Sequence, residues 1–273
     1  MSRSIAVDAE LEELRRRVAE LEQTLSATRE NQRWKLQLAS QVHRSLMPHP
    51  FRDPRIWVDV RYMPIEEVGG DYCQVRFSDR QRLYITISDV TGHGVGAALL
   101  AAYLSSEVRQ SILYGREPRD VVRSLNTVVC DHFIETSLYL TFFVARIDLS
   151  DRTITWCGAG HPSPLLARRG GAAVETLDSQ NPMIGISPDV LADDPEQTLS
   201  LGSGDRLLFY TDGLPETCDA EGQRLGTGGL ASIAVDGAGL DLFQLADHVM
   251  GRVAEFQSGP STDDKTLIVA EMR

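Results

Sequence analysis

Carboxylates recur beside glycine, or at the edge of an apolar run, at four separate places along the chain. A stiff strand end holds such a side chain in place, and a neighbouring glycine lets the backbone turn sharply and approach a ligand closely. Any one of these residues alone is more often a turn former or a helix cap. The positions are Asp71 after Gly69 and Gly70, Asp89 before Gly92, Asp212 before Gly213, and the pair Asp263 and Asp264 before the last apolar run.

Four such ends brought together would form a site of hard oxygen ligands. The sequence has only six histidines and no C-x-x-C pair, so zinc and redox chemistry are not indicated. Oxygen ligands suit Mg²⁺ or Mn²⁺ instead. As a set, the aspartates therefore predict a divalent-cation site.

Composition narrows the class of protein. The 273 residues are 42% hydrophobic and 24% charged, which is typical of a globular chain. A net charge of -12 is the wrong sign for binding nucleic acid or an anionic membrane. The N-terminal residues contain no apolar leader, and the longest apolar stretch, 95–104, is about half the length of a membrane span. We expect a cytoplasmic protein with no membrane partner.

The N-terminal segment has the pattern of a coiled coil. Its apolar residues are spaced alternately by three and four, and opposite charges occupy the flanking positions Glu10 with Arg15 and Arg17 with Glu22. This favours a parallel homodimer, although a single amphipathic helix folded onto its own domain remains the alternative. The seam consists of Leu11, Leu14, Val18, Leu21 and Leu25.

Beyond Leu25 the seam is polar until Ala39, Val42 and Leu46, and Pro48 ends the helix. Because Trp34, Leu36 and Leu38 join this second apolar group, it covers more than one face. We expect it to pack on the following domain. The predicted division is a helix and linker over 1–47 and a folded domain over 48–273.

From residue 56 onward the sequence predicts strands, with helices between some of them. Strands that neighbour strands, with helices grouped in pairs, favour an α+β sandwich over an alternating parallel sheet. The expected strands are 56–63, 82–90, 139–149, 153–157, 205–211 and 266–271, and the expected helices are 94–114, 118–134 and 240–256.

Five segments, in order, look like the signatures of metal-dependent protein phosphatases of the PPM, or type 2C, family. They most resemble the bacterial SpoIIE/RsbU branch, and the resemblance covers about residues 36–273. The segments are VGGDY at 68–72, DVTGHGVGAAL at 89–99, AGHPSPL at 159–165, GDRLLFYTDGL at 204–214 and DDKTL at 263–267.

The resemblance implies a PPM-type β-sandwich flanked by helix pairs, with two Mn²⁺ or Mg²⁺ ions at one edge. The implied catalytic metal ligands are Asp71, Asp89, the Val90 carbonyl, Asp212 and Asp263. Asp264 is less favoured, because the family varies there between Asp and Asn. Many relatives carry a further Asp where this chain has Gln74, which leaves an accessory ligand in doubt.

Two such cations can activate a water for in-line attack on phosphorus and neutralise the phosphoryl oxygens. His93 lies two positions beyond the acid histidine of eukaryotic relatives, so we expect it to shape the loop rather than to donate a proton. We expect His161 to serve motif geometry or substrate contact, and Glu216 to orient a water.

The resemblance also implies the substrate, a phosphoserine or phosphothreonine on a STAS-domain anti-sigma factor antagonist in a partner-switching pathway. The alternative is a catalytically silent dimeric binding module that sequesters a signalling partner, which only Gln74 favours. We further hypothesise that pairing of the N-terminal helices shifts the position of Asp71 and so the affinity for metal.

Overall fold

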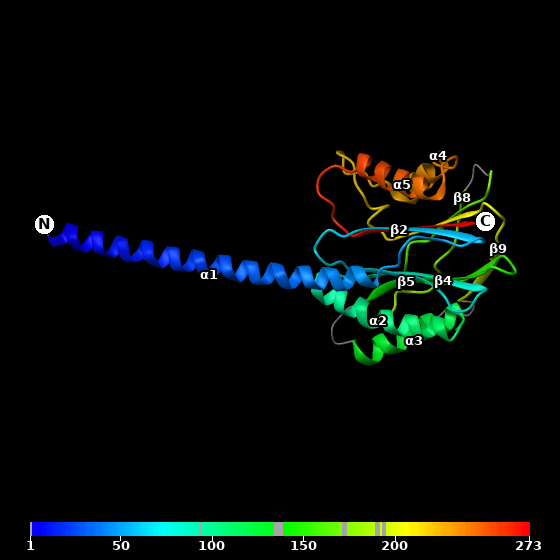
Figure 1. Ribbon diagram of the computed structural model, residues 1–273, viewed down its shortest axis with the longest axis horizontal. Coiled ribbons are helices and arrows are strands. Elements are labelled where there is room, and N and C mark those ends of the chain that lie inside the picture. Colours follow the sequence, from blue (N-terminus) through cyan, green and yellow to red (C-terminus); the bar gives the residue numbers. More distant parts are fainter. Residues whose placement is uncertain (1, 93, 134–138, 171–173, 189–191, 193–194) are drawn as a thin grey trace.

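Two antiparallel β-sheets lie face to face between two pairs of helices in the computed structural model (Figure 1). The structure describes residues 2–92, 94–133, 139–170, 174–188, 192 and 195–273, with side chains from residue 12 onward. This arrangement confirms the predicted α+β sandwich.

The first sheet contains the last strand of the chain in its interior. Its strand order is β1 (Phe51–Arg52), β2 (Ile56–Met63), β11 (Lys265–Met272), β10 (Arg206–Tyr210), β7 (Leu165–Ala167) and β8 (Val174–Thr176). Helices α4 (Gly226–Asp236) and α5 (Leu242–Phe256) cover its outer face.

The second sheet is a meander with one added strand. Its order is β3 (Asp71–Phe77), β4 (Arg82–Val90), β5 (Leu140–Asp148), β6 (Thr153–Ala159) and β9 (Gln197–Ser200). Helices α2 (Val95–Leu113) and α3 (Pro118–His132) cover its outer face.

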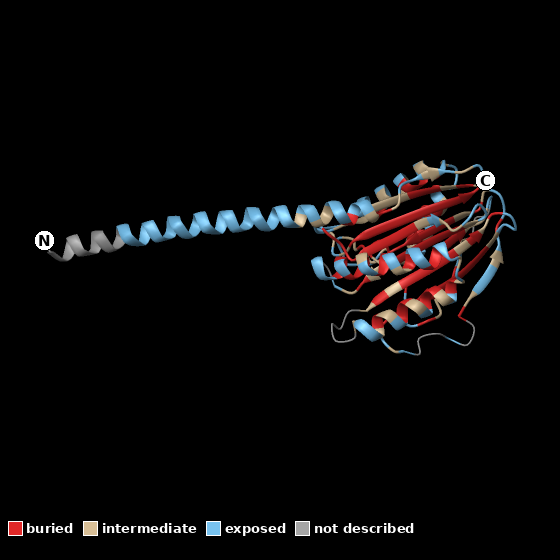
Figure 2. Cartoon of the chain, turned by 60° about the horizontal axis from the view of Figure 1, so that its bottom comes forward, coloured by how far each residue is buried: buried red, intermediate tan, exposed pale blue. Residues whose placement is uncertain are grey.

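Apolar side chains fill the space between each pair of layers. Between the sheets, the rings of Phe143 and Phe209 meet edge to face, with centroids 6.0 Å apart. Figure 2 shows this buried interior along both sheets. Because both faces of each sheet are covered, β11 is buried throughout and has a continuous apolar run at its centre, residues 267–270.

Six elements of the domain were not anticipated from the sequence, namely strands β1, β3, β7, β8 and β9 and helix α4. Strand β3 includes Gln74 and Arg76, and helix α4 begins with three glycines among four residues, so neither has strong local propensity. Helix α5, in contrast, begins at Asp241, whose side chain forms a capping box with Gln244.

Helix α1 (Ser2–Leu46) projects from the domain (Figures 1 and 2). Its predicted seam is open in the single chain, with Leu14, Val18, Leu21 and Leu25 each at least half exposed. The prediction that the second apolar group packs on the domain is wrong in part. Leu46 packs beside the α2 and α3 core, and Leu36 and Ala39 are partly buried, whereas Trp34, Leu38 and Val42 are 61%, 48% and 54% exposed.

Candidate metal centre

Asp71 and Asp89 stand directly opposite each other on the antiparallel strands β3 and β4. Asp71 is the first residue of β3 and is buried, and Asp89 is the penultimate residue of β4 and half buried. Side chains at directly opposed positions of a sheet lie close together. The sheet register therefore brings two predicted ligands to one edge of the sandwich.

Two threonines of the first sheet orient Asp71 of the second. Thr211 Oγ1 and Thr266 Oγ1 donate to Oδ2 of Asp71 at 2.8 and 2.6 Å. Thr266 N also donates to Thr211 Oγ1 at 3.0 Å, so the two hydroxyls form one network. Sequence reasoning missed both roles, although Thr211 immediately precedes Asp212 and Thr266 follows Asp263 by three residues.

Asp264 clamps the loop that leads into β3. Its Oδ1 accepts from Ile65 N at 2.8 Å and its Oδ2 accepts from Gly70 N at 2.9 Å. A Cβ on Gly69 would lie 2.0 Å from Asp264 Oδ2, so this position requires glycine. Because both oxygens of Asp264 serve the loop, Asp263 is the better candidate ligand of this pair.

Three oxygen atoms surround the space left by the missing side chain of Gly70. A Cβ there would lie 2.8 Å from the Val90 carbonyl oxygen and 3.3 Å from both Asp89 Oδ1 and the Gly92 carbonyl oxygen. Because glycine adds no side chain here, these oxygen atoms lie close together, and such a group of oxygen ligands suits a hard cation. The Val90 carbonyl and the Asp89 carboxylate therefore both stay candidate ligands.

The remaining predicted ligands lie next to strands of the first sheet. Asp212 follows β10, and its Oδ1 is buried without a hydrogen-bond partner. Asp263 precedes β11, and its Oδ1 accepts from Asp264 N at 2.8 Å. The structure thus gathers Asp71, Asp89, Asp212 and Asp263 at one edge of the sandwich.

Burial and mutual repulsion raise the pKa of these carboxyls. Burial, followed by Asp212 and Asp263, raises the pKa of Asp89 to about 8. Burial, then Asp263 and Glu216, raises the pKa of Asp212 to about 6, and burial and Asp89 raise that of Asp71. Carboxylates that raise one another's pKa lack a compensating positive charge, which a divalent cation would supply.

The side chains form an open arrangement rather than a closed cage. Within the described residues, no three His, Cys, Asp or Glu side chains are close enough to hold one ion together. Backbone carbonyl and water oxygens would therefore complete any coordination shell, as is usual for Mg²⁺.

His161 is a buried structural residue. Its Nε2 donates to the Tyr210 carbonyl at 3.1 Å and its Nδ1 accepts from Thr141 Oγ1 at 2.7 Å. Burial lowers the pKa of His161 to about 3, so the ring is neutral. It fixes the backbone that leads to Asp212, in agreement with the predicted role in motif geometry.

The structure describes two of the three other residues considered in the sequence, Glu216 and Gln74. Glu216 lies close enough to Asp212 to raise its pKa, but Glu216 Oε1 pairs with Arg224 at 2.5 Å.

Gln74 is buried against α2, where its Nε2 donates to the Ser105 carbonyl at 2.7 Å. Because Gln74 lies three residues along β3 from Asp71, it faces away from the site. His93 lies outside the described residues.

Helix α1 reaches the ligand loop through His43, a contact that sequence reasoning missed. His43 is 3% exposed, and its Nδ1 lies 3.5 Å from the Tyr62 hydroxyl. Burial lowers the pKa of His43, and the nearby carboxylate of Asp264 opposes this shift. The histidine therefore packs directly behind the loop that positions Asp71.

Two known phosphatases are similar to this chain in sequence. The chain is 30% identical over 187 residues to phosphoserine phosphatase RsbP of Bacillus subtilis (strain 168), an alignment that covers 67% of this chain and 46% of RsbP. It is 23% identical over 248 residues to phosphoserine phosphatase RsbU of the same organism, covering 90% of this chain and 72% of RsbU. The chain thus spans about half the length of the first relative.

Solved structures share the fold. The SiaA-PP2C domain of Pseudomonas aeruginosa superposes with a TM-score of 0.77 at 22% identity, covering 90% of this chain and 99% of that one. RsbX in complex with magnesium superposes with a TM-score of 0.63 at 16% identity, covering 83% of this chain and all of RsbX. The fold is therefore that of PP2C phosphatases.

The family model of stage II sporulation protein E matches residues 79–273, which include Asp89, Asp212 and Asp263. Together with the similarity to RsbP and RsbU, this match shows that the chain belongs to the SpoIIE family.

Proposed function

We propose that this chain is a metal-dependent phosphatase that hydrolyses phosphoserine or phosphothreonine on a regulatory protein. The observation that supports it best is the gathering of Asp71, Asp89, Asp212 and Asp263 at one edge of the sandwich, with pKa values raised by burial and by one another. This donor set fits divalent cations.

The proposed ligands are these four carboxylates and the Val90 carbonyl, and we propose two ions, Mn²⁺ or Mg²⁺. When bound, such ions would neutralise the phosphoryl oxygens and lower the pKa of the attacking water. The threonine hydroxyls would keep Asp71 in one orientation, and the clamp of Asp264 on Gly70 would keep the Val90 carbonyl accessible. Because His161 is buried and neutral, we assign it no proton transfer.

For the substrate, we propose a phosphorylated STAS-domain anti-anti-sigma protein, following the resemblance to the SpoIIE/RsbU branch. We propose that the protein acts in the cytoplasm as a homodimer, with residues 1–47 as its pairing and linking segment and residues 48–273 as the phosphatase. Among the described helices, none has the length and apolarity needed to span a bilayer. The alternative of a silent binding module loses its support, because Gln74 faces α2 and not the site.

Hydrolysis of p-nitrophenyl phosphate and of a phosphoserine peptide tests the activity. We expect Mn²⁺ or Mg²⁺ to be required and EDTA to abolish turnover. Asp89→Asn and Asp212→Asn should each lower kcat by several orders of magnitude, because each removes charge from the site. Asp151→Asn, in the exposed turn after β5, is the matched control and should keep the full rate.

Full turnover in excess EDTA, or near-normal rates in both site variants, would refute the metal-centre proposal. The substrate proposal has its own test, which uses a phosphorylated STAS protein encoded by a neighbouring gene. If this protein is not hydrolysed while the peptide is, only the proposed substrate is refuted.

A further inference from the structure

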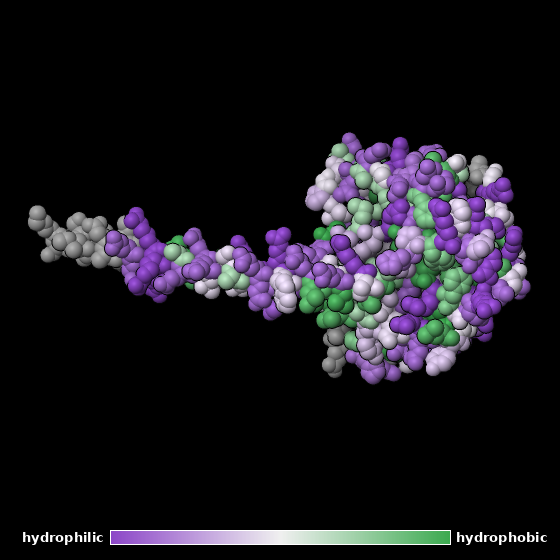
Figure 3. Space-filling view, in the orientation of Figure 1, coloured by the Kyte–Doolittle hydropathy of each residue, from purple (hydrophilic) through white to green (hydrophobic). Residues whose placement is uncertain are grey.

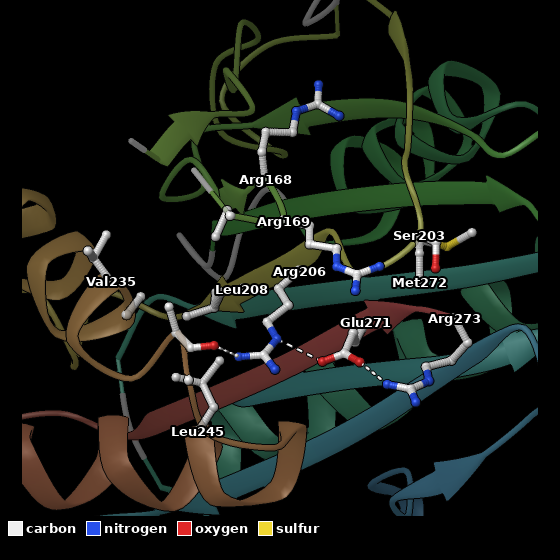
Figure 4. Close-up of a pocket in the computed structure, with 16 residues that line it drawn as sticks. Arg168, Arg169, Ser203, Arg206, Leu208, Val235, Leu245, Glu271, Met272 and Arg273 are labelled. Atoms are coloured by element: carbon white, nitrogen blue, oxygen red, sulfur yellow. Dashed lines mark hydrogen bonds and ion pairs between the residues drawn. The ribbon is translucent and has the colours of Figure 1, made fainter. Parts of the chain in front are cut away.

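A pocket of about 550 Å³ lies at the opposite end of the first sheet from the aspartates (Figure 4). Its lining includes Arg206, the first residue of β10, and Met272, the last residue of β11. Thr211 follows the other end of β10, about 17 Å away at the usual rise of a strand. The pocket is therefore a separate site, within the size range of small-ligand cavities.

Four arginines line this pocket in a chain whose net charge is -12. Arg206 and Arg273 share a single carboxylate: Glu271 Oε2 accepts from Arg206 Nε at 2.7 Å, and Glu271 Oε1 accepts from Arg273. Arg206 also donates to the carbonyls of Ala238 and Leu240. One buried carboxylate thus faces two guanidinium groups. Each guanidinium has five N–H donors, so some of these donors are not used by the hydrogen bonds described.

Arg169 is the guanidinium most available to a ligand. Whereas Arg168 pairs with Glu175 and Asp205, the described residues offer no acidic partner to the side chain of Arg169. Its backbone is held in place, because Arg169 N donates to Asp205 Oδ1 at 3.0 Å, and the stem of its exposed side chain crosses Gly204. A Cβ on Gly204 would lie 2.5 Å from Arg169 Cδ, and Gly204 has a φ of +85°.

The pocket also has an apolar wall. Leu208 of β10 and Leu245 of α5 are buried in the core beneath α4 and line the cavity beside the guanidinium groups. Figure 4 shows Leu208 next to Arg206, with Arg169 above it. A ligand that satisfied both surfaces would carry an anionic group on an apolar body.

We propose that this pocket binds a small organic anion, in which a carboxylate or phosphate-type group is carried on an apolar ring or chain. The anionic group pairs with Arg169 and the free N–H donors of Arg206, and the apolar body lies against Leu208 and Leu245. This proposal does not depend on the phosphatase activity.

Calorimetric titration with phenylphosphonate, which a phosphatase cannot hydrolyse, tests the site. The full chain is used in EDTA, so that no metal binds the probe. We expect saturable binding at one site, and about tenfold weaker binding by Arg169→Gln, since a charge-assisted hydrogen bond contributes about 1.5 kcal/mol or more. Arg109→Gln, an exposed arginine on α2, is the charge-matched control and should bind as the unmodified chain does.

Two further probes separate the anionic group from the apolar body. Inorganic phosphate and benzyl alcohol should each bind more weakly than phenylphosphonate. Equal affinity of the Arg169→Gln and Arg109→Gln proteins, or no saturable binding by the unmodified chain, overturns the proposal.

Discussion

Thr266 of the first sheet donates a hydrogen bond to Asp71 of the second sheet, with 2.6 Å between Oγ1 and Oδ2. Thr211 donates to the same oxygen. The contact that orients a candidate ligand therefore also joins the two sheets at the edge of the sandwich.

Replacing Thr266 should cost both stability and metal affinity. Thr266→Val keeps the volume but leaves the buried Asp71 with one donor fewer, so we expect a loss of about 1 to 3 kcal/mol in the free energy of unfolding. Urea denaturation measures it. Thr266→Ser keeps the hydroxyl and is the control; equal stability of the two variants would contradict the assigned role.

The buried neutral state of His161 predicts a pH dependence of stability. Its pKa is about 3 in the folded chain and near 6.5 when unfolded, so the unfolded chain binds more protons between these values. Stability should fall as the pH falls below 6.5, by up to about 1.4 kcal/mol per pH unit from this group. In His161→Gln the decline should be shallower, whereas the exposed control His132→Gln should follow the unmodified chain. Urea unfolding at several pH values distinguishes them, and parallel curves for all three proteins would contradict the prediction.

The exposed seam of α1 predicts dimerisation through that helix. Deleting residues 1–30 removes Leu14, Val18, Leu21 and Leu25, which are half exposed or more in the single chain. We expect sedimentation to show a dimer for the full chain and a monomer for the truncated one. A truncated chain that still dimerises would place the interface elsewhere.

The same truncation tests the coupling of helix pairing to the metal centre. If pairing positions the Asp71 loop, the deletion should raise the Mn²⁺ concentration for half-maximal activity, with less change in the rate at saturating Mn²⁺. Superimposable Mn²⁺ titrations of the full and truncated chains would show that α1 is only a tether.

His43 is the residue through which α1 should act on that loop. His43→Ala removes the ring that packs against Tyr62 behind Gly69 and Asp71, and a cost of about 1.4 kcal/mol in metal binding would raise the half-saturating Mn²⁺ concentration tenfold. The exposed His49→Ala in the following loop is the control and should leave the titration unchanged. A shift of equal size in both variants would mean that the effect is not specific to His43.

Sequence reasoning reached the sandwich because its strands and long helices carry strong periodicity, and it reached the aspartates because glycines mark the turns beside them. It missed β3 and α4, whose local propensities are weak and whose formation depends on tertiary packing. It also missed β1, β7, β8 and β9, which have only two to four residues each and are too short to show a periodic pattern. The roles of Thr211, Thr266 and His43 depend on contacts between residues far apart in the chain, which one sequence does not display. The second apolar group of α1 was misplaced because periodicity tells which residues share a face, but not whether a partner covers it.

Strand β11 lies between β2 and β10, with Met272 paired to Ile56 and Lys265 paired to Met63. During synthesis, β2 leaves the ribosome long before β11 exists, so the first sheet can be completed only when β11 has emerged. Asp263, just ahead of β11, emerges equally late. A nascent chain would therefore lack one candidate ligand of the proposed metal centre, and we expect activity only after the whole domain has been translated.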